Sequence, residues 1–551
     1  MKRYIFVVFA ILFCAWFAAP FAAINIIEKR VPFVNIGSAS FGLNGLHLHN
    51  VVIDKKNGID ILAYIKHINI RNFTEPYSVY VVGGQVDIEI INKLSNTHSD
   101  TSNSILNKIH LYVSDVNVSI KKKDFTQITL ENVSYQNEQK EDRIWFESGL
   151  ILFKSKTLRV TDGSASRDGS IITFKTLEMD FQFPFDIPLF PKGILKANGV
   201  KIDTKKRKAN IKSIRFGAAE AQNVFAGILP SQGVFFISEK TTIQHRWIAP
   251  QPVTFLNIKA EAQKNELHDI TITIGDASVR VNLKDYKAVG RASCEQWIQA
   301  LPDPKPKAFQ QSLGGYSGEL SFFIQVYPEP SFKLNNSCSF KCSHEPIQSL
   351  INPNGFIYTA YDKDSKPFMR LAGPNTDEWV ALEDVSPELV LAVNALEDPG
   401  FQSHKGILVS ALQKSLVDNL KTGKFSRGGS TITMQLAKNL WLTRDKTLLR
   451  KVHEALLTVT LESCFTKNRI MEMYLNVAEF GSDIYGIGPG THYHFDKEPI
   501  ELTPVEAFFM AKVLPSPKNA SPTKRRMKGI RTLMRNLANS GFAVGDFAEE
   551  N

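Results

Sequence analysis

Two glutamates in the last third of the sequence, Glu397 and Glu454, are accompanied by cations in a pattern that suits sugar transfer. Attack by a sugar hydroxyl on an anomeric carbon needs a base that takes the hydroxyl proton. It also needs positive charge that stabilises a departing diphosphate. Glu397 ends a segment with helical spacing and can supply the base, while Lys438 and the Arg450–Lys451 pair can supply the charge.

The segment 427–439 reads Arg-Gly-Gly-Ser-Thr-Ile-Thr-Met-Gln-Leu-Ala-Lys-Asn. Its two glycines would let the backbone approach a ligand closely. The Ser430–Thr431 pair stands where a helix N-terminus offers free N–H groups to phosphate. Gln435 and Lys438 are three residues apart and therefore share one helical face. Taken by itself, the segment is equally consistent with a well-capped helix.

A second cluster, Arg450, Lys451 and Glu454, lies within about one helical turn and presents two cations with one carboxylate. The alternative interpretation is a salt bridge on the protein surface between Arg450 and Glu454. The block 469–476 is expected to pack the fold, with Glu472 and Asn476 as scaffold contacts.

Five blocks in this order resemble the glycosyltransferase family 51 domain, which polymerises peptidoglycan glycan chains in monofunctional transglycosylases and in class A penicillin-binding proteins. The blocks are Glu397 to Gly406, Gly428 to Asn439, Arg450 to Glu454, Arg469 to Asn476 and Gly486 to Lys497. The lead-in Trp379 to Pro387 is similar to that of the monofunctional enzymes. The resemblance covers about the last third of the chain.

The resemblance implies a lysozyme-like, mainly helical domain in which Glu397 is the base and Glu454 the second catalytic glutamate. Glu454 would assist the leaving pyrophosphate directly or through a divalent cation, Mg²⁺ or Mn²⁺. It implies no other cofactor and no firm metal ligand set. The residues expected to bind substrate are Asp398, Phe401, His404, Arg427, Gly429, Ser430, Thr431, Gln435, Lys438, Asn439, Arg450 and Lys451.

Three positions depart from the family pattern. Met434 replaces the first glutamine of a Gln-Gln pair, Pro489–Gly490 stands where small alanines are common, and His494–Phe495 replaces Tyr-Phe. These changes could reshape the acceptor cleft. Because both glutamates and the main cations are present, an active enzyme is preferred to a degenerate one. No transpeptidase domain is expected, so the enzyme is predicted to be monofunctional.

The N-terminus predicts attachment to a membrane. After Lys2 and Arg3, the segment from Tyr4 to Ile27 holds no charge, and about 20 apolar residues suffice to cross a bilayer as a helix. The preceding positive residues place the N-terminus in the cytoplasm and the bulk of the chain in the periplasm. A cleaved signal peptide is the alternative.

From about Val31 to Tyr327 apolar and polar residues alternate, as in Val86 to Ile90 and Ile270 to Ile274, which is typical of half-buried strands. Several strands are expected to open on a small or turn-forming residue, such as Gly45, Gly84 and Gly199, and to form an irregular β-repeat. This region resembles the periplasmic AsmA-type bridge proteins, whose elongated sheets carry lipids. The segment 301–307, rich in proline and lysine, is expected to be a linker or a bend.

Four cysteines lie outside the apolar segment, namely Cys294, Cys338, Cys342 and Cys464. Cys338 and Cys342 would be about 13 Å apart on an extended strand, which exceeds the usual disulfide range of roughly 4.4–6.8 Å. Buried or idle thiols are therefore expected. The basic tail around 524–535 could contact anionic lipid headgroups or could be a solvated helix face.

The sequence predicts an α+β multidomain protein of the bacterial inner membrane, crossing it once. The expected parts are a cytoplasmic stub and transmembrane helix (1–30), a large β-rich extracytoplasmic region (31–345) and a glycosyltransferase domain (346–551). The expected partners are lipid II, the growing glycan chain, the inner membrane and other cell-wall synthesis proteins. A net charge of +10 also suits nucleic acid, but no nucleic-acid module is present. Two further interpretations remain, a degenerate lipid-handling scaffold and a lysozyme-like glycan hydrolase that uses Glu397 as general acid.

Overall fold

The structure is a computed structural model, and it divides into two compact units, Met1–Glu239 and Lys240–Asn551. The boundary predicted at residue 345 lies inside the second unit. The described residues are 23–25, 28–29, 34–42, 45–54, 61–71, 77–87, 109–121, 126–138, 141–153, 156–166, 170–181, 193–229, 233–263, 268–326, 329–345, 347–422 and 429–539.

The predicted membrane anchor, Tyr4 to Ile27, lies outside the described residues apart from 23–25. Within the portion of the chain that is described, no helix is both long enough and apolar enough to span a bilayer. The anchor therefore stays a prediction.

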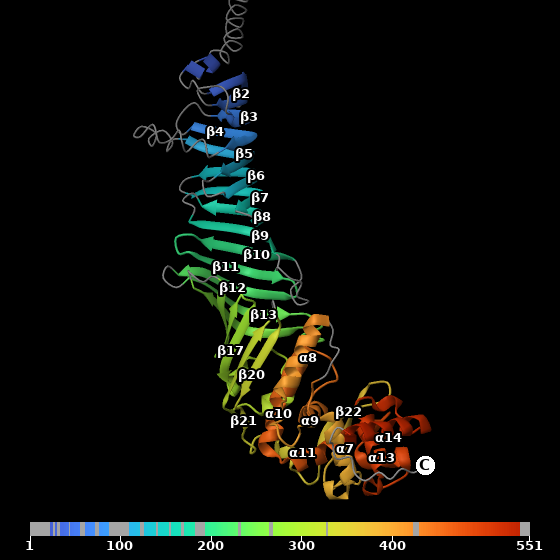
Figure 1. The fold of residues 1–551 in the computed structure, drawn as a ribbon. Helices are drawn as coiled ribbons and strands as arrows, with labels where there is room; N and C mark the ends of the chain where they lie inside the picture. The colour runs from blue at the N-terminus through green and yellow to red at the C-terminus, as the bar shows by residue number, and fades with distance from the viewer. Residues whose placement is uncertain are drawn as a thin grey trace, which may run out of the picture. The chain divides into compact units, whose positions relative to one another are not determined.

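The first unit is a sheet whose strands pair with their neighbours in chain order (Figure 1). All pairs from β1 to β12 are antiparallel except β4 with β5, which is parallel. The strands are β1 (Val34–Gly42), β2 (Gly45–Asp54), β3 (Ile61–Arg71), β4 (Tyr77–Asp87), β5 (Ile109–Lys121), β6 (Thr126–Glu138), β7 (Glu141–Phe153), β8 (Lys156–Ser166), β9 (Ile171–Phe181), β10 (Gly193–Asp203), β11 (Lys208–Phe216) and β12 (Ala219–Leu229). The predicted β-rich region is confirmed.

Residues with positive φ interrupt many of these strands near the middle. They are Asn50, Gly83, Asp115, Asn132, Asp162, Gly199 and Asn223. A left-handed residue breaks the alternation of side chains along its strand, so the apolar pattern shifts by one position there. In β2, for example, Leu46 and Leu48 are followed by Val51, and all three are buried. Among the pairs that the structure describes, the pairing register itself shifts at such residues only between β5 and β6, at Asp115 and Asn132. Gly45 opens β2, as predicted, whereas Gly84 and Gly199 lie within strands, so the prediction that these two open strands was wrong.

The second unit begins with the end of β13 (Gly233–Ile243), which starts in the first unit, and continues with six antiparallel strands. Its paired strands are β14 (Val253–Ala262), β15 (Asp269–Ile274), β16 (Ala277–Asn282), β17 (Lys287–Ser293), β19 (Glu319–Gln325) and β20 (Ser331–Asn336). Two short helices, α4 (Cys294–Ala300) and α5 (Lys307–Gln311), lie between β17 and β19. The segment 301–307 joins these two helices and is therefore a bend.

The rest of the unit is mainly helical, as predicted. Two short strands, β18 (Tyr316–Ser317) and β21 (Ser339–Phe340), form a pair, and the helix α6 (Ile347–Leu350) leads to a hairpin of β22 (Phe356–Tyr361) and β23 (Pro367–Ala372). The helices that follow are α7 (Pro387–Glu397), α8 (Val409–Thr422), α9 (Ile432–Trp441), α10 (Leu448–Cys464), α11 (Lys467–Val477), α12 (Ile487–Phe495), α13 (Pro504–Val513) and α14 (Lys524–Asn539). A small pair, β24 (Glu479–Gly481) with β25 (Ile484–Tyr485), precedes α12.

Local sequence signals explain where these helices begin. Ser386 is the N-cap of α7, with Pro387 at its first position, and Thr503 forms a capping box with Glu506 at the start of α13. α7 packs against α13, and α9 packs against both α10 and α11, while α8 lies beside β20 (Figure 1). This packing puts the C-terminal end of α7 close to the middle of α9.

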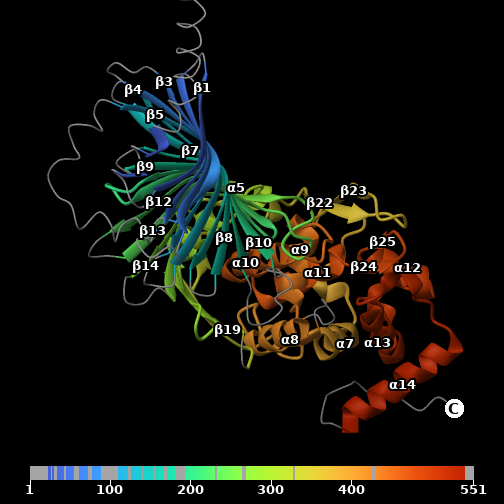
Figure 2. The ribbon, with the colours of Figure 1, turned by 90° about the horizontal axis from the view of Figure 1, so that it is seen from above.

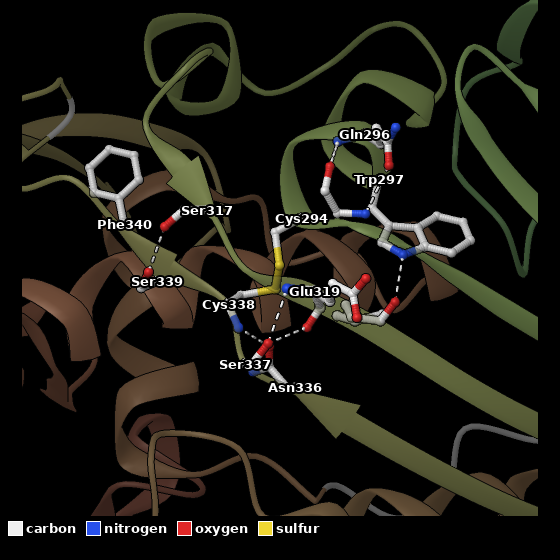
Figure 3. The surroundings of a disulfide bond; sticks show 12 residues. Cys294, Gln296, Trp297, Ser317, Glu319, Asn336, Ser337, Cys338, Ser339 and Phe340 are labelled. Carbon is white, nitrogen blue, oxygen red and sulfur yellow. Dashed lines mark hydrogen bonds between the residues drawn. A yellow bond between two sulfur atoms is a disulfide. The ribbon is translucent and has the colours of Figure 1, made fainter.

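The four cysteines form two disulfides, Cys294–Cys338 and Cys342–Cys464, so the prediction of idle thiols was wrong. The spacing argument considered only the neighbours Cys338 and Cys342, whereas each pairs with a cysteine far away in sequence that the fold brings near. Their Cα atoms are 5.9 and 5.4 Å apart, within the usual range. Figure 3 shows that the first bond joins the start of α4 to the segment after β20.

Candidate active site

Glu397 is the last residue of α7, and α9 holds its carboxylate from the opposite side. The side-chain nitrogen Nε2 of Gln435 donates to Oε2 of Glu397 at 2.8 Å. The hydroxyl of Tyr474 in turn donates to the side-chain oxygen Oε1 of Gln435 at 3.1 Å. Tyr474 is fully buried, and burial, together with the negative charge of Glu397, raises its pKa well above 10. Within the described residues nothing donates to the other oxygen of Glu397, which leaves that oxygen able to accept a proton.

The loop after Glu397 is fastened to the start of α9 by Asp398 and His404. Asp398 is buried, and its carboxylate accepts from His404 Nε2 at 2.9 Å and from the Ile432 N–H at 3.1 Å. The Gly406 N–H donates to Nδ1 of His404, so the proton of the imidazole is assigned to Nε2. These bonds fix the loop that follows Glu397. Contact of Asp398 or His404 with substrate stays a prediction.

The N-terminus of α9 is largely satisfied by the protein itself. The Thr431 hydroxyl accepts from the Met434 N–H at 3.1 Å, and Asp398 takes the Ile432 N–H. Fewer N–H groups are therefore available to a phosphate than the sequence suggested. A Cβ on Gly429 would lie 2.7 Å from the Ala411 carbonyl oxygen. The small size of Gly429 thus serves its packing against α8.

Phe401 is completely buried, and the ammonium group of Lys467 lies 4.6 Å from the centre of its ring. The same ammonium donates to Glu462 at 2.8 Å, and the Thr433 hydroxyl donates to that carboxylate too. Phe401 therefore packs the junction of the Glu397 loop with the helices α9 and α10. Its predicted contact with substrate stays a prediction.

Glu454 lies on α10 with only 1% of its surface exposed. One carboxylate oxygen accepts from Arg450 and the other from Lys451. Lys451 also donates to the Ser430 hydroxyl, which links α10 to the segment before α9. The cluster is thus buried, and the interpretation of Arg450 and Glu454 as a surface salt bridge was wrong. Burial lowers the pKa of Lys451, and the charge of Glu454 opposes that shift.

The surroundings of Glu454 do not fit a divalent cation held by the protein. Both of its oxygens accept from cationic side chains, and in the portion of the chain that is described no group of three or more His, Cys, Asp or Glu residues could hold a metal ion. Mg²⁺ and Mn²⁺ prefer several oxygen ligands. The residues around Glu454 therefore do not form a site for such an ion.

Lys438 lies one turn after Gln435 on α9 and faces a cavity with Asn439, Arg444 and Glu479. Tyr358, Thr359, Tyr361 and Tyr485 line the same cavity. Burial lowers the pKa of Lys438, while the charge of Glu454 raises it and the cations nearby lower it further. Together Lys438, Arg450 and Lys451 exceed the single negative charge of Glu454, so this side of the site suits an anion.

The rest of the second unit holds α10 at both ends. At its start, the N–H groups of Leu448 and Leu449 donate to the carbonyls of Trp247 and Ile248, at 2.8 and 3.1 Å. These are orphan donors of a helix N-terminus, so the loop between β13 and β14 acts as their cap. At its end, Cys464 is bonded to Cys342.

Two hydrogen bonds reinforce this attachment. The Ser463 hydroxyl accepts from the Phe340 N–H at 3.0 Å, and the Tyr316 hydroxyl bonds Thr460 at 2.7 Å in a buried position. Burial raises the pKa of Tyr316 to about 12. The segment 244–345 therefore fixes the position of the helix that carries Glu454.

The departures from the family pattern lie in packed regions. Met434 is fully buried, and His494 packs near Phe509 and hydrogen-bonds the Phe480 carbonyl at 2.6 Å. A Cβ on Gly490 would lie 2.7 Å from the Phe480 Cβ, which explains the glycine. The contacts seen for these residues are with the core of the helical part rather than with Glu397 or Glu454.

The structure brings together most of the predicted site residues, but Arg427 and Gly428 lie outside the described residues. Sequence reasoning missed Arg444, which donates to Glu479 at 2.7 Å and to the Tyr485 hydroxyl at 2.8 Å. It also missed Tyr474 as the partner of Gln435. No spacing rule signals either residue, because the contacts join elements that lie far apart in the sequence. The expected scaffold contacts are present, since Glu472 accepts from Trp379 and Asn476 bonds the Val380 backbone.

Comparison with known proteins agrees with this geometry. The family described as Transglycosylase matches residues 364–539. Relatives named biosynthetic peptidoglycan transglycosylase include one from Nitrosomonas europaea, 40% identical over 163 residues, which are 29% of this chain and 67% of the relative. Another from Haemophilus influenzae is 40% identical over 166 residues, 30% of this chain and 68% of the relative. A third, from Shewanella denitrificans, is 43% identical over 154 residues, 28% of this chain and 67% of the relative.

Proposed function

This chain belongs to the peptidoglycan transglycosylase family and is a glycosyltransferase, and from that premise we propose that it polymerises lipid II. In the proposed reaction a sugar hydroxyl of one substrate attacks the anomeric carbon of the other. The new bond is a β-1,4 link formed with inversion, and the bond to the diphosphate breaks. The products are a glycan strand and undecaprenyl pyrophosphate.

The observation that carries the proposal is the arrangement around Glu397. Gln435 orients the carboxylate through one oxygen, and Tyr474 orients Gln435. A base must lie within hydrogen-bonding reach of the proton that it takes, and it works best when its own orientation is fixed. The other oxygen of Glu397 would accept the proton of the attacking hydroxyl.

The departing diphosphate would be stabilised from α9 and α10. Lys438 faces the cavity, and the ion pairs to Glu454 hold Arg450 and Lys451 in fixed positions. Cations that are already in place when charge develops need no reorganisation during the reaction. Glu454 would thus act by positioning the two cations.

We further propose that the protein works at the inner membrane with its bulk in the periplasm. Three observations support this proposal. The segment from Tyr4 to Ile27 is apolar and follows two positive residues. Two disulfides are typical of an oxidising compartment. The exposed face of α14 carries several cations, and residues 507–545 contain no Asp or Glu, which suits anionic headgroups.

Purified protein incubated with lipid II tests the function directly. We expect polymer from the parent, a loss of at least 100-fold in Glu397→Gln, and normal activity in the control Glu383→Gln, because Glu383 is exposed and lies on another element. Equal activity in Glu397→Gln would refute the proposed base. Release of reducing sugars from purified peptidoglycan would instead indicate a hydrolase. Protease accessibility in spheroplasts tests the location, and full protection of residues 240–551 would contradict it.

A further inference from the structure

The hairpin of β22 and β23 presents very different side chains on its two faces. On the inner face Phe356 and Tyr358 are buried, and β22 packs against α9. On the outer face Ile357, Met369 and Leu371 are 65%, 65% and 54% exposed. Ile357 lies opposite Leu371, and Met369 lies opposite the neighbouring Thr359, so the three side chains form one surface, here called the hairpin patch.

The hairpin patch is presented by a fixed element. The ammonium group of Lys518 donates to the Lys363 carbonyl at 3.2 Å and to the Ser365 hydroxyl at 3.3 Å, which ties down the turn. The Tyr361 N–H donates to the Tyr485 hydroxyl at 2.8 Å. In Figure 2 the hairpin lies at the margin of the helical part. Adjacent large apolar side chains that are held in water mark a surface that contacts something else.

The hairpin patch adjoins the cationic cavity of the active site. Thr359 lines the cavity that Lys438 and Arg444 face, and its hydroxyl contacts the sulfur of Met369 at 3.9 Å. One residue thus separates a surface that suits hydrocarbon from a cavity that suits a phosphate anion. A lipid-linked diphosphate presents these same two chemistries, in the same order, along its length.

We propose that the hairpin patch enters the hydrocarbon of the lipid bilayer beside the active site. The insertion holds the cavity at the level of the headgroups, so that a lipid-linked diphosphate reaches Lys438 while its chain stays in the bilayer. The role assigned to the insertion rests on the proposed function, but the insertion itself does not need catalysis. The insertion is favourable because each of the three apolar side chains is transferred from water to hydrocarbon.

Depth-resolved fluorescence of the full chain in lipid nanodiscs tests the insertion. A Cys14→Ser background with Ile357→Cys or Met369→Cys carries a polarity-sensitive dye, and Lys333→Cys, exposed on β20, is the matched control. We expect nitroxide groups on the acyl chains to quench the dye at 357 and 369 at least threefold more than at 333. Equal quenching at all three positions would overturn the proposal.

A triple variant, Ile357→Gln with Met369→Gln and Leu371→Gln, separates insertion from chemistry. In detergent we expect its polymerisation rate to stay within twofold of the parent. In nanodiscs we expect the KM for lipid II to rise roughly tenfold, because partitioning to the bilayer is weakened.

A loss of activity in detergent would show that the patch serves the fold and would overturn the proposal. A dimer of the parent that the triple variant lacks would make a second copy the occupant, which also overturns it. If the parent makes no polymer in detergent, the proposed function fails while the quenching result still stands.

Discussion

Breaking the disulfide Cys342–Cys464 should loosen the helix that carries Glu454. The bond closes a sequence separation of 122 residues, and Cys294–Cys338 closes one of 44. In the chain-entropy description the first contributes about 5 kcal/mol and the second about 4 kcal/mol of stability. The two loops do not overlap in sequence, so each contribution can be removed separately.

The change is the pair Cys342→Ser and Cys464→Ser, and the measurement is hydrogen exchange of the amides of α10. Removing up to about 5 kcal/mol from the state that protects α10 would speed exchange by as much as roughly 5,000-fold. Exchange is the suitable readout because a chain with two compact units need not unfold in one step. The pair Cys294→Ser and Cys338→Ser is the control, since neither residue is bonded to α10.

A thiol count on the same protein checks the premise. The chain has five cysteines, of which four are paired, so the denatured, unreduced protein should expose the single thiol of Cys14. After reduction it should expose all five. Three or more thiols before reduction, or unchanged exchange of α10 in the Cys342→Ser and Cys464→Ser variant, would refute the reasoning.

Three further outcomes are expected. Burial lowers the pKa of Lys438, so Lys438 should lose its charge, and the enzyme its activity, at a pH below the ordinary lysine pKa of 10.5. Lys438→Arg should move this alkaline limb of the pH–rate profile to higher pH. A limb that does not move would belong to another group. Burial lowers the pKa of His453 to about 4, so between pH 6.5 and 4 the unfolded chain binds more protons than the folded chain. The free energy of unfolding should therefore fall by up to about 3 kcal/mol as the pH drops through that range. Denaturant titrations of His453→Asn should lack this contribution and show only the loss that other groups cause. Glu454→Gln leaves two cations in a buried site without their anion, which should cost roughly 3–5 kcal/mol of stability and at least 100-fold in polymerisation, whereas the exposed control Glu383→Gln should change neither quantity.

The sequence predicted the strand-rich and helical parts because alternation and helical spacing were strong in each. The starts of the strands that contain Gly84 and Gly199 were misplaced because a left-handed residue inside a strand was not recognised. Around Asn223, for example, Ala219 and Ala221 are followed by Val224 and Ala226, so a strict period of two breaks at the left-handed residue. An Asn, Asp or Gly flanked by apolar residues at −4, −2, +1 and +3 would have signalled the left-handed residue.

The candidate site was predictable where a motif fixes both residue type and position. Glu397, Lys438 and Glu454 were found in this way, and the structure places them on α7, α9 and α10. The missed contacts join elements that lie far apart in the sequence. Tyr474 on α11 donates a hydrogen bond to Gln435 on α9, and Cys342 is bonded to Cys464, 122 residues later in the sequence. Pairwise spacing within one segment carries no information on such contacts.

The attachment of α10 changes how the β-rich part of the second unit should be understood. A separate binding module would touch the catalytic helices through a surface of its own, yet here the carbonyls of Trp247 and Ile248 complete the first turn of α10. The buried hydrogen bond between the hydroxyls of Tyr316 and Thr460 would break if the two parts moved apart, at a cost of about 1 kcal/mol. Movement of residues 244–345 and movement of Glu454 are thus coupled. A ligand that shifts this part of the sheet would therefore alter the position of Arg450 and Lys451, and with it the charge offered to the leaving group.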